Sequence, residues 1–455
     1  MSNGGREWQV SPSTPHTIGA TTAACVIIAA VVGSGIFSLT GQFGAQLQTP
    51  ANVLAAWIFG GILALSGALC FAELGAMMPC SGGSVEFARR AFGPTVGYLV
   101  AMVTILAGYI LSEALVALFL AGYVDDLFAI DLPDAGIAAA SIVLVLLTQL
   151  FSVRAGFFAN SSLTYVKIGF VLAFVVTGLL LPLESRIEAP LSTTIATTSA
   201  PGFFSPAVAL ATLSVSFAYL GWSNGADIAG EVRSPGRNVP IAIIGAMTLV
   251  FVLYIGMNLV YLRVMDPSAM VGENGGPMPA IGATTARHLF GDAVGSSMGA
   301  VIALLFFSTN VAGMIGGARI LESMAHAGEI PPAVGHRTQS GVPRNALLVV
   351  TVGALLALLL GSLSQILDLL VILITVFSSL SVAAVIVLRR TMPDAPRPFR
   401  VPLFPITPLV YLAVALWSVV LSVQASGWDP IIAAGVTVAA LLVARPLLAR
   451  KSKHA

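Results

Sequence analysis

Twelve long apolar stretches dominate this chain of 455 residues. A helix needs about 20 apolar residues to cross the roughly 30 Å of hydrocarbon in a bilayer. Stretches of this length lie near residues 18–44, 52–78, 95–124, 135–152, 160–182, 206–231, 239–264, 294–327, 344–361, 365–389, 405–426 and 429–448. Only 9% of the residues are charged, whereas a soluble domain carries roughly 25%. The sequence therefore predicts an all-α polytopic membrane protein with twelve transmembrane helices.

Basic residues predict how these helices are oriented. If both termini lie on one side, that side holds every arginine and lysine of the loops and termini except Arg186, Arg263 and Arg287. Cytoplasmic loops are rich in arginine and lysine. We therefore expect a multi-pass protein of the plasma (inner) membrane whose two termini are cytoplasmic. The first apolar stretch is too long for a signal peptide and is predicted to stay as a transmembrane helix.

Cysteine, histidine and net charge limit the kinds of function that fit. The chain has three cysteines, five histidines and a net charge of +1. No predicted span holds a spaced pair of histidines, which argues against a membrane metalloenzyme. We expect no metal, no cofactor and no nucleic-acid partner. The sequence does not indicate which oligomeric state the protein adopts. A polytopic membrane enzyme or sensor stays a distant alternative, since the chain lacks a catalytic domain or nucleophile motif.

Glycine clusters interrupt two of the predicted helices. The first stretch contains the segment Val31–Phe37 (VVGSGIF), and the sixth contains Phe217–Gly225 (FAYLGWSNG). Glycine lets a helix unwind, and unwound backbone at membrane depth is tolerated only where it lines a protein cavity. The alternative is a surface of small residues for close helix packing. Two clusters in matching positions, five spans apart, favour the inverted repeats of a secondary transporter.

Free backbone groups at such breaks have a definite chemistry. The second half of a broken helix begins with free N–H groups, which favour a carboxylate. The first half ends with free carbonyl groups, which favour an ammonium group. One broken helix thus offers half of a site for an α-amino acid.

Ionisable residues inside the predicted spans suggest a second kind of site. Lys167 lies among apolar residues of the fifth span, where it either snorkels to the surface or has a coupling or gating role. Glu113 in the third span is too short to snorkel and needs a partner, a cavity or a proton. Glu73, Asp227, Glu231 and Arg319 lie near the cytoplasmic ends of spans, and we expect salt bridges among them that close the inner side.

Four motifs carry a resemblance to a known family. They are Gly33–Phe37 (GSGIF), the run from Ala72 to Pro94, the segment Glu231–Ile243 (EVRSPGRNVPIAI) and the stretch Arg397–Pro405 (RPFRVPLFP). With these motifs the chain resembles the amino acid–polyamine–organocation (APC) transporters over nearly its whole length. Its sixth span is most similar to the arginine–agmatine antiporter branch, and the L-type amino acid exchangers are the other near branch.

The resemblance implies a LeuT-like fold, in which two inverted repeats of five helices are followed by two further helices. Helices one and six are broken in that fold. The implied parts are a cytoplasmic N-terminal segment 1–17, a first repeat 18–182, a second repeat 206–390, two C-terminal helices 405–448 and a basic tail 449–455.

The resemblance also implies a substrate site. Ser34 and Gly35 would hold a carboxylate, and Phe217 and Leu220 would offer carbonyls to an amine, with Phe217 as an aromatic gate. The antiporter branch has a tryptophan in place of Phe217 and a glutamate in place of Ser223. The predicted substrate-binding residues are Val31, Gly33, Ser34, Gly35, Phe217, Leu220, Gly221 and Ser223.

Lys167 matches a fifth-helix lysine that resembles a substitute for the sodium ion of sodium-coupled relatives. It is expected to reach toward Gly33, Ser308 and Thr309. The sequence thus predicts a sodium-independent secondary transporter of amino acids or related amines, working by alternating access through substrate exchange or proton symport. The alternative is a cationic amino acid or polyamine antiporter, which Glu113 favours.

Overall fold

The computed structural model describes residues 18–79, 82–128, 132–151, 153–183, 185–188, 201–272, 276–278, 280–338 and 342–448. The predicted N-terminal segment 1–17 and basic tail 449–455 lie outside these residues. Regular secondary structure in the described residues is helical, apart from three isolated β-bridges.

The helices follow the predicted stretches, except for Gly83–Phe92 and Ile281–Phe290, which lie in the connections between stretches. They are α1 (Ala20–Val31), α2 (Gly35–Leu47), α3 (Pro50–Met77), α4 (Gly83–Phe92), α5 (Pro94–Val103), a π-helical segment η1 (Thr104–Leu111), α6 (Ser112–Phe128), α7 (Asp134–Phe151), α8 (Val153–Leu180), α9 (Pro206–Ala218), α10 (Asn224–Asp227), α11 (Pro235–Val264), α12 (Ile281–Phe290), α13 (Asp292–His326), α14 (Arg344–Ala357), α15 (Leu363–Thr391), α16 (Ile406–Ser426) and α17 (Asp429–Leu448). Helix α4 lies in the connection between the second and third predicted stretches.

Eight helical segments of the described chain are long and apolar enough to cross a membrane. They are Ala20–Leu47, Pro50–Met77, Pro94–Phe128, Pro235–Val264, Asp292–His326, Leu363–Thr391, Ile406–Ser426 and Asp429–Leu448. Four shorter apolar helices fall in the four other predicted stretches: Asp134–Leu150, Tyr165–Leu180, Pro206–Ala218 and Arg344–Ala357. The prediction of an all-α polytopic membrane protein is confirmed.

Local sequence signals set several helix ends. Thr49 and Ser205 precede α3 and α9, and each side chain accepts a hydrogen bond from the backbone of the first turn. A proline follows each of these caps, where its missing N–H costs nothing. Ser362 and Gln365 form a capping box at the start of α15. Gly361, at a φ of 124°, separates α14 from α15, so the short link between them is a real helix boundary.

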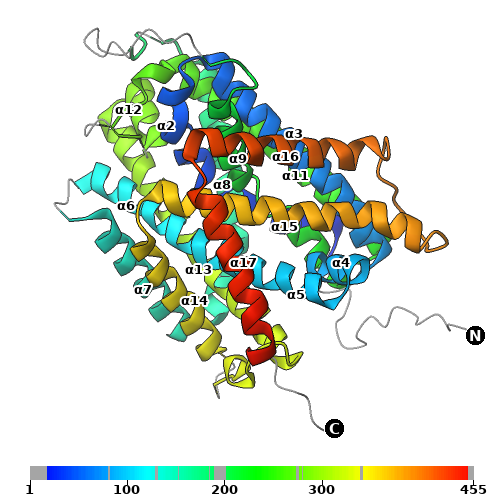
Figure 1. The fold of residues 1–455 in the computed structure, drawn as a ribbon. Coiled ribbons are helices and arrows are strands. Elements are labelled where there is room, and N and C mark those ends of the chain that lie inside the picture. Colours follow the sequence, from blue (N-terminus) through cyan, green and yellow to red (C-terminus); the bar gives the residue numbers. More distant parts are fainter. Residues whose placement is uncertain are drawn as a thin grey trace, which may run out of the picture.

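Two groups of helices pack mainly within themselves. In the first group α11 lies against α3 and α1, while α9 lies against α3 and α2. In the second group α13 lies against α6, α7 and α14, and α6 also contacts α7. Figure 1 shows α7 and α14 side by side at one flank, with α15 and α16 running lengthwise across the molecule. The helix α17 crosses α15 on the outside.

Two features differ from the sequence prediction. Helix α8 begins at Val153 rather than near residue 160, which places Lys167 about 21 Å along the helix at 1.5 Å per residue. The third span contains the π-helical segment η1 between α5 and α6. No spacing of apolar residues marks a π-helix, but such segments are frequent at functional sites.

Candidate functional site

The first helix break lies between α1 and α2. The N–H of Val32 still bonds the carbonyl of Ile28 at 2.8 Å, but the N–H of Gly33 turns back to Val31 at 2.8 Å. Because α2 starts anew at Gly35, its first N–H groups have no helical carbonyl one full turn earlier, and of these groups the N–H of Phe37 bonds the carbonyl of Ser34 at 3.1 Å. The Ser34 side chain is buried beside them, and its hydroxyl has no hydrogen-bond partner in the described structure. The break therefore presents donors without acceptors.

The second helix break runs from Tyr219 to Ser223, between α9 and α10. Gly221 turns the chain there with a φ of 119°, which side chains rarely allow. A Cβ atom on Gly221 would lie 3.0 Å from the carbonyl carbon of Ala30 and from Cγ2 of Val31. Glycine is thus required both for the turn and for the close approach of the end of α1.

The two breaks lie against each other. A Cβ atom on Gly35 would come within 2.5 Å of the Ala218 Cβ, so the first turn of α2 packs directly on the last residue of α9. The end of α1 meets Gly221 in the same way. The structure therefore brings together the two glycine clusters that the sequence singles out, from positions far apart in the chain.

Tyr254 on α11 joins both breaks and was missed by the sequence analysis. Its hydroxyl lies 2.8 Å from the carbonyl oxygen of Val31 and 3.2 Å from that of Ala218. A hydroxyl donates one proton, so it serves one carbonyl at a time. The ring is fully buried and packs edge-on against Trp57, with centroids 5.5 Å apart.

Two further buried tyrosines fix the first turn of α2. The hydroxyl of Tyr261, two turns after Tyr254 on α11, donates to the carbonyl of Ile36 at 3.2 Å. The hydroxyl of Tyr123 on α6 donates to the carbonyl of Phe37 at 2.7 Å. The only sequence signal for these contacts is that a buried tyrosine needs a partner for its hydroxyl.

The residues predicted around the second break lie in different surroundings. Phe217 is almost buried, and its carbonyl already accepts the N–H of Leu220 at 3.1 Å. The carbonyl of Ser223 accepts the N–H groups that start α10. Trp222 turns away and packs edge-on against Phe71, with centroids 4.5 Å apart. The carbonyls that share the Tyr254 hydroxyl between the two breaks are those of Val31 and Ala218, and the Val31 carbonyl also accepts the N–H of Gly33.

Lys167 reaches the first break through a threonine. Its side chain is 2% exposed, and its ammonium group donates to the hydroxyl of Thr309 on α13 at 3.3 Å. A Cβ atom on Gly33 would lie 3.5 Å from Cγ2 of the same threonine. Lys167, Thr309 and Gly33 thus meet where α8, α13 and the first break come together. Among the described residues, no three His, Cys, Asp or Glu side chains are grouped to hold a metal.

Glu113 lies on α6, directly after the π-helical segment. Its side chain is 2% exposed, and its Oε1 has no hydrogen-bond partner in the described structure. Its Oε2 lies 3.1 Å from the position a Cβ atom on Gly313 would take. Gly313 follows Thr309 by one helical turn, so Glu113 and Lys167 both face α13.

Charged residues tie the C-terminal end of α3, where Glu73 lies, to neighbouring elements. The buried carboxylate of Glu73 accepts from Arg389 at 2.5 Å, lies 3.4 Å from the guanidinium of Arg397, and accepts from the N–H of Val401 at 2.6 Å. The carboxylate of Asp227 accepts from the N–H of Ser84 at 3.2 Å. Glu73 thus takes its partners from α15 and the loop that follows α15, rather than from the other residues near the span ends.

Paired helix breaks inside a bundle of apolar helices are typical of secondary transporters. The sequence matches the amino acid permease family over residues 18–442, and the chain belongs to this family. The resemblance to APC transporters is confirmed, and the protein is a transporter of amino acids rather than an enzyme.

Individual relatives cover most of the chain. It is 28% identical over 416 residues to b(0,+)-type amino acid transporter 1 of Mus musculus, covering 89% of this chain and 82% of that protein. It is 28% identical over 442 residues to large neutral amino acids transporter small subunit 2 of Homo sapiens, covering 94% and 79%. These relatives agree with the L-type exchanger branch.

Proposed function

We propose that this protein is a sodium-independent exchanger of amino acids or related amines. The observation that carries the proposal is the Tyr254 hydroxyl, which lies within hydrogen-bond distance of carbonyls at the ends of both α1 and α9. One side chain thus marks the place where both breaks leave backbone groups for a zwitterion. The relatives named as amino acid transporters support this substrate class.

The proposed architecture is twelve spans in the LeuT-like arrangement, with repeats at 18–182 and 206–390 and two helices in 405–448. Four shorter apolar helices complete the number when added to the eight long segments. The breaks fall in the first and sixth of these spans, as inverted repeats require. Loop arginines favour a plasma-membrane protein with both termini in the cytoplasm.

The proposed motion follows the two packing groups of helices. The spans built from α1 and α2, from α3, from α9 and α10, and from α11 would rock as one bundle. The spans built from α6, α7, α13 and α14 would form the scaffold. Contacts within each group support this division. Alternating access would then expose the paired breaks to either side in turn.

The proposed site binds both charges of an amino acid with backbone groups. The substrate carboxylate would accept from the Ser34 hydroxyl, which has no other partner in the described structure, and from the first N–H groups of α2. The ammonium group would take whichever carbonyl of Val31 or Ala218 the Tyr254 hydroxyl leaves free, because that hydroxyl donates to only one of them at a time. Phe217 would cover the bound substrate.

Lys167 takes the role of a coupling ion in this proposal. Its ammonium group reaches Thr309, which also contacts the first break at Gly33. A fixed positive charge at that place would make a bound sodium ion unnecessary, and it would hold α8 against α13.

Glu113 supports a second candidate function. A buried carboxylate with a free oxygen would pair with the cationic side chain of a substrate, or carry a proton. The protein would then be a cationic amino acid or polyamine antiporter, or a proton symporter.

Uptake into sealed liposomes tests these alternatives. Purified protein would be reconstituted with or without internal amino acid, in sodium or choline buffer, and given radiolabelled neutral and cationic amino acids and polyamines. For the exchanger we expect uptake that requires internal substrate and proceeds equally in sodium and choline buffer. Uptake into empty liposomes driven by a proton gradient would support symport instead, and a sodium requirement would overturn the role given to Lys167. The absence of uptake for every amino acid and amine would overturn the proposed function.

A further inference from the structure

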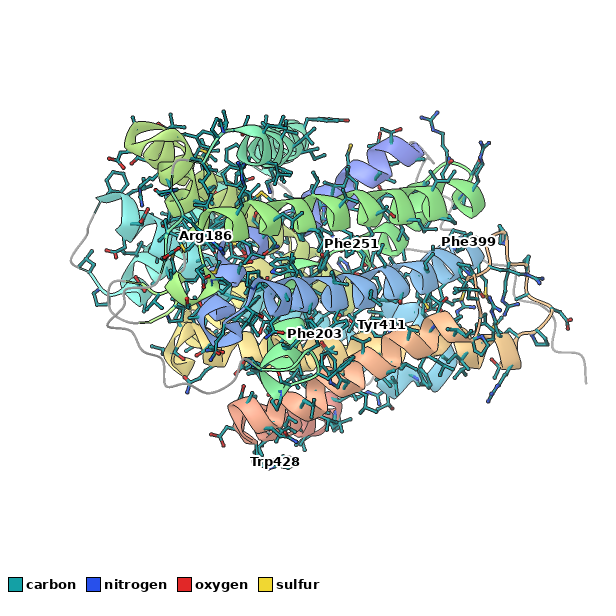
Figure 2. The ribbon with its side chains drawn as sticks, turned by 90° about the horizontal axis from the view of Figure 1, so that it is seen from above. Arg186, Phe203, Phe251, Phe399, Tyr411 and Trp428 are labelled. Carbon is teal, nitrogen blue, oxygen red and sulfur yellow. The ribbon has the colours of Figure 1, made fainter. Side chains whose placement is uncertain are left out.

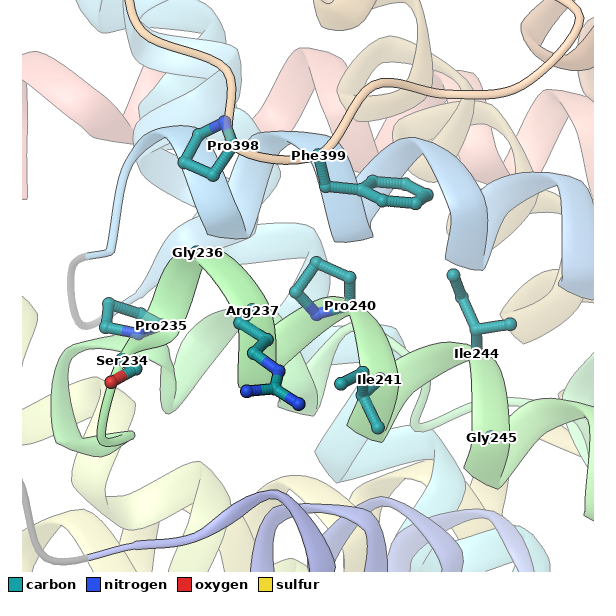
Figure 3. Close-up of a pocket in the computed structure, with 10 residues that line it drawn as sticks. All are labelled: Ser234, Pro235, Gly236, Arg237, Pro240, Ile241, Ile244, Gly245, Pro398 and Phe399. Carbon is teal, nitrogen blue, oxygen red and sulfur yellow. The ribbon is translucent and has the colours of Figure 1, made fainter.

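A groove of about 690 Å³ lies at the start of α11. The first turns of α11, from Ser234 to Gly245, form one side, and Pro398 and Phe399 from the loop before α16 form the other (Figure 3). Figure 2 shows Phe399 and Arg186 toward opposite ends of the molecule. The groove therefore lies at one membrane surface, on the side predicted to be cytoplasmic.

The groove is built from two of the motifs that the transport site leaves unused. They are the segment Glu231–Ile243 and the stretch Arg397–Pro405. A Cβ atom on Gly236 would lie 2.8 Å from Cβ of Pro398, so the two segments pack tightly where they meet. Glu73 fixes the loop from the other side through its contacts with Arg397 and Val401.

The inner end of the groove opens onto an apolar stripe of α11. Ile241 is 52% exposed, and a Cβ atom on Gly245 would have no other heavy atom within 4 Å. Leu249 and Val252 continue the same face at helical spacing and are also exposed. In a bilayer this stripe faces acyl chains, so the groove and the hydrocarbon region are continuous.

The outer end of the groove is positively charged. Arg237 is exposed at the first turn of α11, and Arg400 is exposed beside Phe399. Neither arginine has an ion-pair partner among the described residues. Residues 234–245 and 397–401 contain no acidic residue.

We propose that this groove binds an anionic phospholipid of the surrounding leaflet. The lipid phosphate would lie at Arg237, and an acyl chain would follow Ile241, Gly245 and Val252. Charge at one end and a lipid-facing apolar stripe at the other match the two parts of one phospholipid. A free phosphate would leave the apolar half of the groove empty. Since transport chemistry plays no part in it, the proposal stands apart from the proposed function.

Native mass spectrometry of the detergent-purified full-length protein tests this proposal. The probes are phosphatidylglycerol, phosphatidylcholine with the same acyl chains, and inorganic phosphate. We expect phosphatidylglycerol to bind more tightly than phosphatidylcholine, and R237A to weaken its binding about fivefold, the factor for one arginine at an anionic lipid. The matched control R390A removes another exposed arginine from a helix end and is expected to leave binding unchanged.

A second pair of variants tests the apolar half. Gly245→Phe places a ring in the groove, whereas Gly435→Phe places the same ring on the exposed face of α17, where it also has open space. Only Gly245→Phe is expected to lower phosphatidylglycerol binding. Equal binding of both lipids, or equal effects of R237A and R390A, would overturn the proposal. Phosphate that competes fully with the lipid in both phenylalanine variants would show a simple anion site and would also overturn it.

Discussion

Tyr254→Phe is the sharpest test of how the two helix breaks are held. The substitution removes the hydroxyl that lies 2.8 Å from the carbonyl of Val31 and 3.2 Å from that of Ala218. It keeps the ring, which packs against Trp57 and Tyr219 at centroid distances of 5.5 Å and 5.1 Å. The change therefore isolates one hydrogen bond and creates no cavity.

The magnitude follows from the burial of these groups. Tyr254 is fully buried, so the carbonyl that loses the hydroxyl finds no water in exchange, and the Val31 carbonyl keeps only its bond from the N–H of Gly33. The loss of one such buried hydrogen bond costs about 1–2 kcal/mol. If the hydroxyl keeps the breaks in a geometry that binds substrate, the same free energy corresponds to a rise of about five- to thirtyfold in the KM for exchange.

The assay compares exchange kinetics in liposomes with thermal unfolding of the same preparations. Tyr411→Phe is the matched control, because Tyr411 is equally buried and its ring also packs on a residue of the second break, Trp222, but among the described residues its hydroxyl bonds no carbonyl of either break. We expect the control to lose some stability and to keep its KM. A Tyr254→Phe variant whose KM matches that of Tyr411→Phe would refute the idea that the hydroxyl positions the breaks.

Three further substitutions test single residues of the site. Gly221→Ala should destabilise the protein by about 1–3 kcal/mol in denaturant unfolding, because the φ of Gly221 is 119° and the new Cβ atom would lie 3.0 Å from atoms of α1. Gly245→Ala, whose Cβ atom would have open space, should not destabilise it. Lys167→Ala should reduce the exchange rate about tenfold or more, because a buried charged donor is lost, and Thr309→Val should reduce the rate less. If added sodium restored the full rate of the lysine variant, that result would contradict a sodium-independent role for the Lys167 ammonium. Glu113→Gln should reduce the uptake of cationic substrates about tenfold and leave the uptake of neutral amino acids unchanged. An equal loss for both classes would contradict the idea that the Glu113 carboxylate recognises the positive charge of a substrate.

Sequence patterns located the breaks because glycine changes local backbone energetics. The clusters around Gly33 and Gly221 weaken the helix wherever they stand, so their effect can be predicted without knowing the neighbours. The apolar stretches are equally local, since each helix must satisfy its own backbone groups in lipid. Both kinds of feature therefore appear in the structure close to their predicted positions.

Contacts between distant residues left no comparable signal. Tyr254 and Val31 are 223 positions apart, and Tyr123 and Phe37 are 86 apart. A buried tyrosine in a sequence indicates only that its hydroxyl needs a hydrogen-bond partner, and the fold determines which carbonyl accepts from it. The same holds for Glu73, whose partners Arg389 and Arg397 come from the far end of the chain.

The helix α13 connects the two ionisable groups that the sequence could only consider separately. Lys167 bonds Thr309, and Glu113 faces Gly313, one turn or about 6 Å along the same helix. Both contacts fall on the scaffold, whereas Gly33 beside Thr309 belongs to the proposed bundle. Because charges in a low-dielectric interior act on each other over such distances, a proton or a cationic substrate at Glu113 would alter the field at Lys167. The lysine is the group that reaches the first break, so α13 is the physical route by which Glu113 would influence the substrate site without touching it.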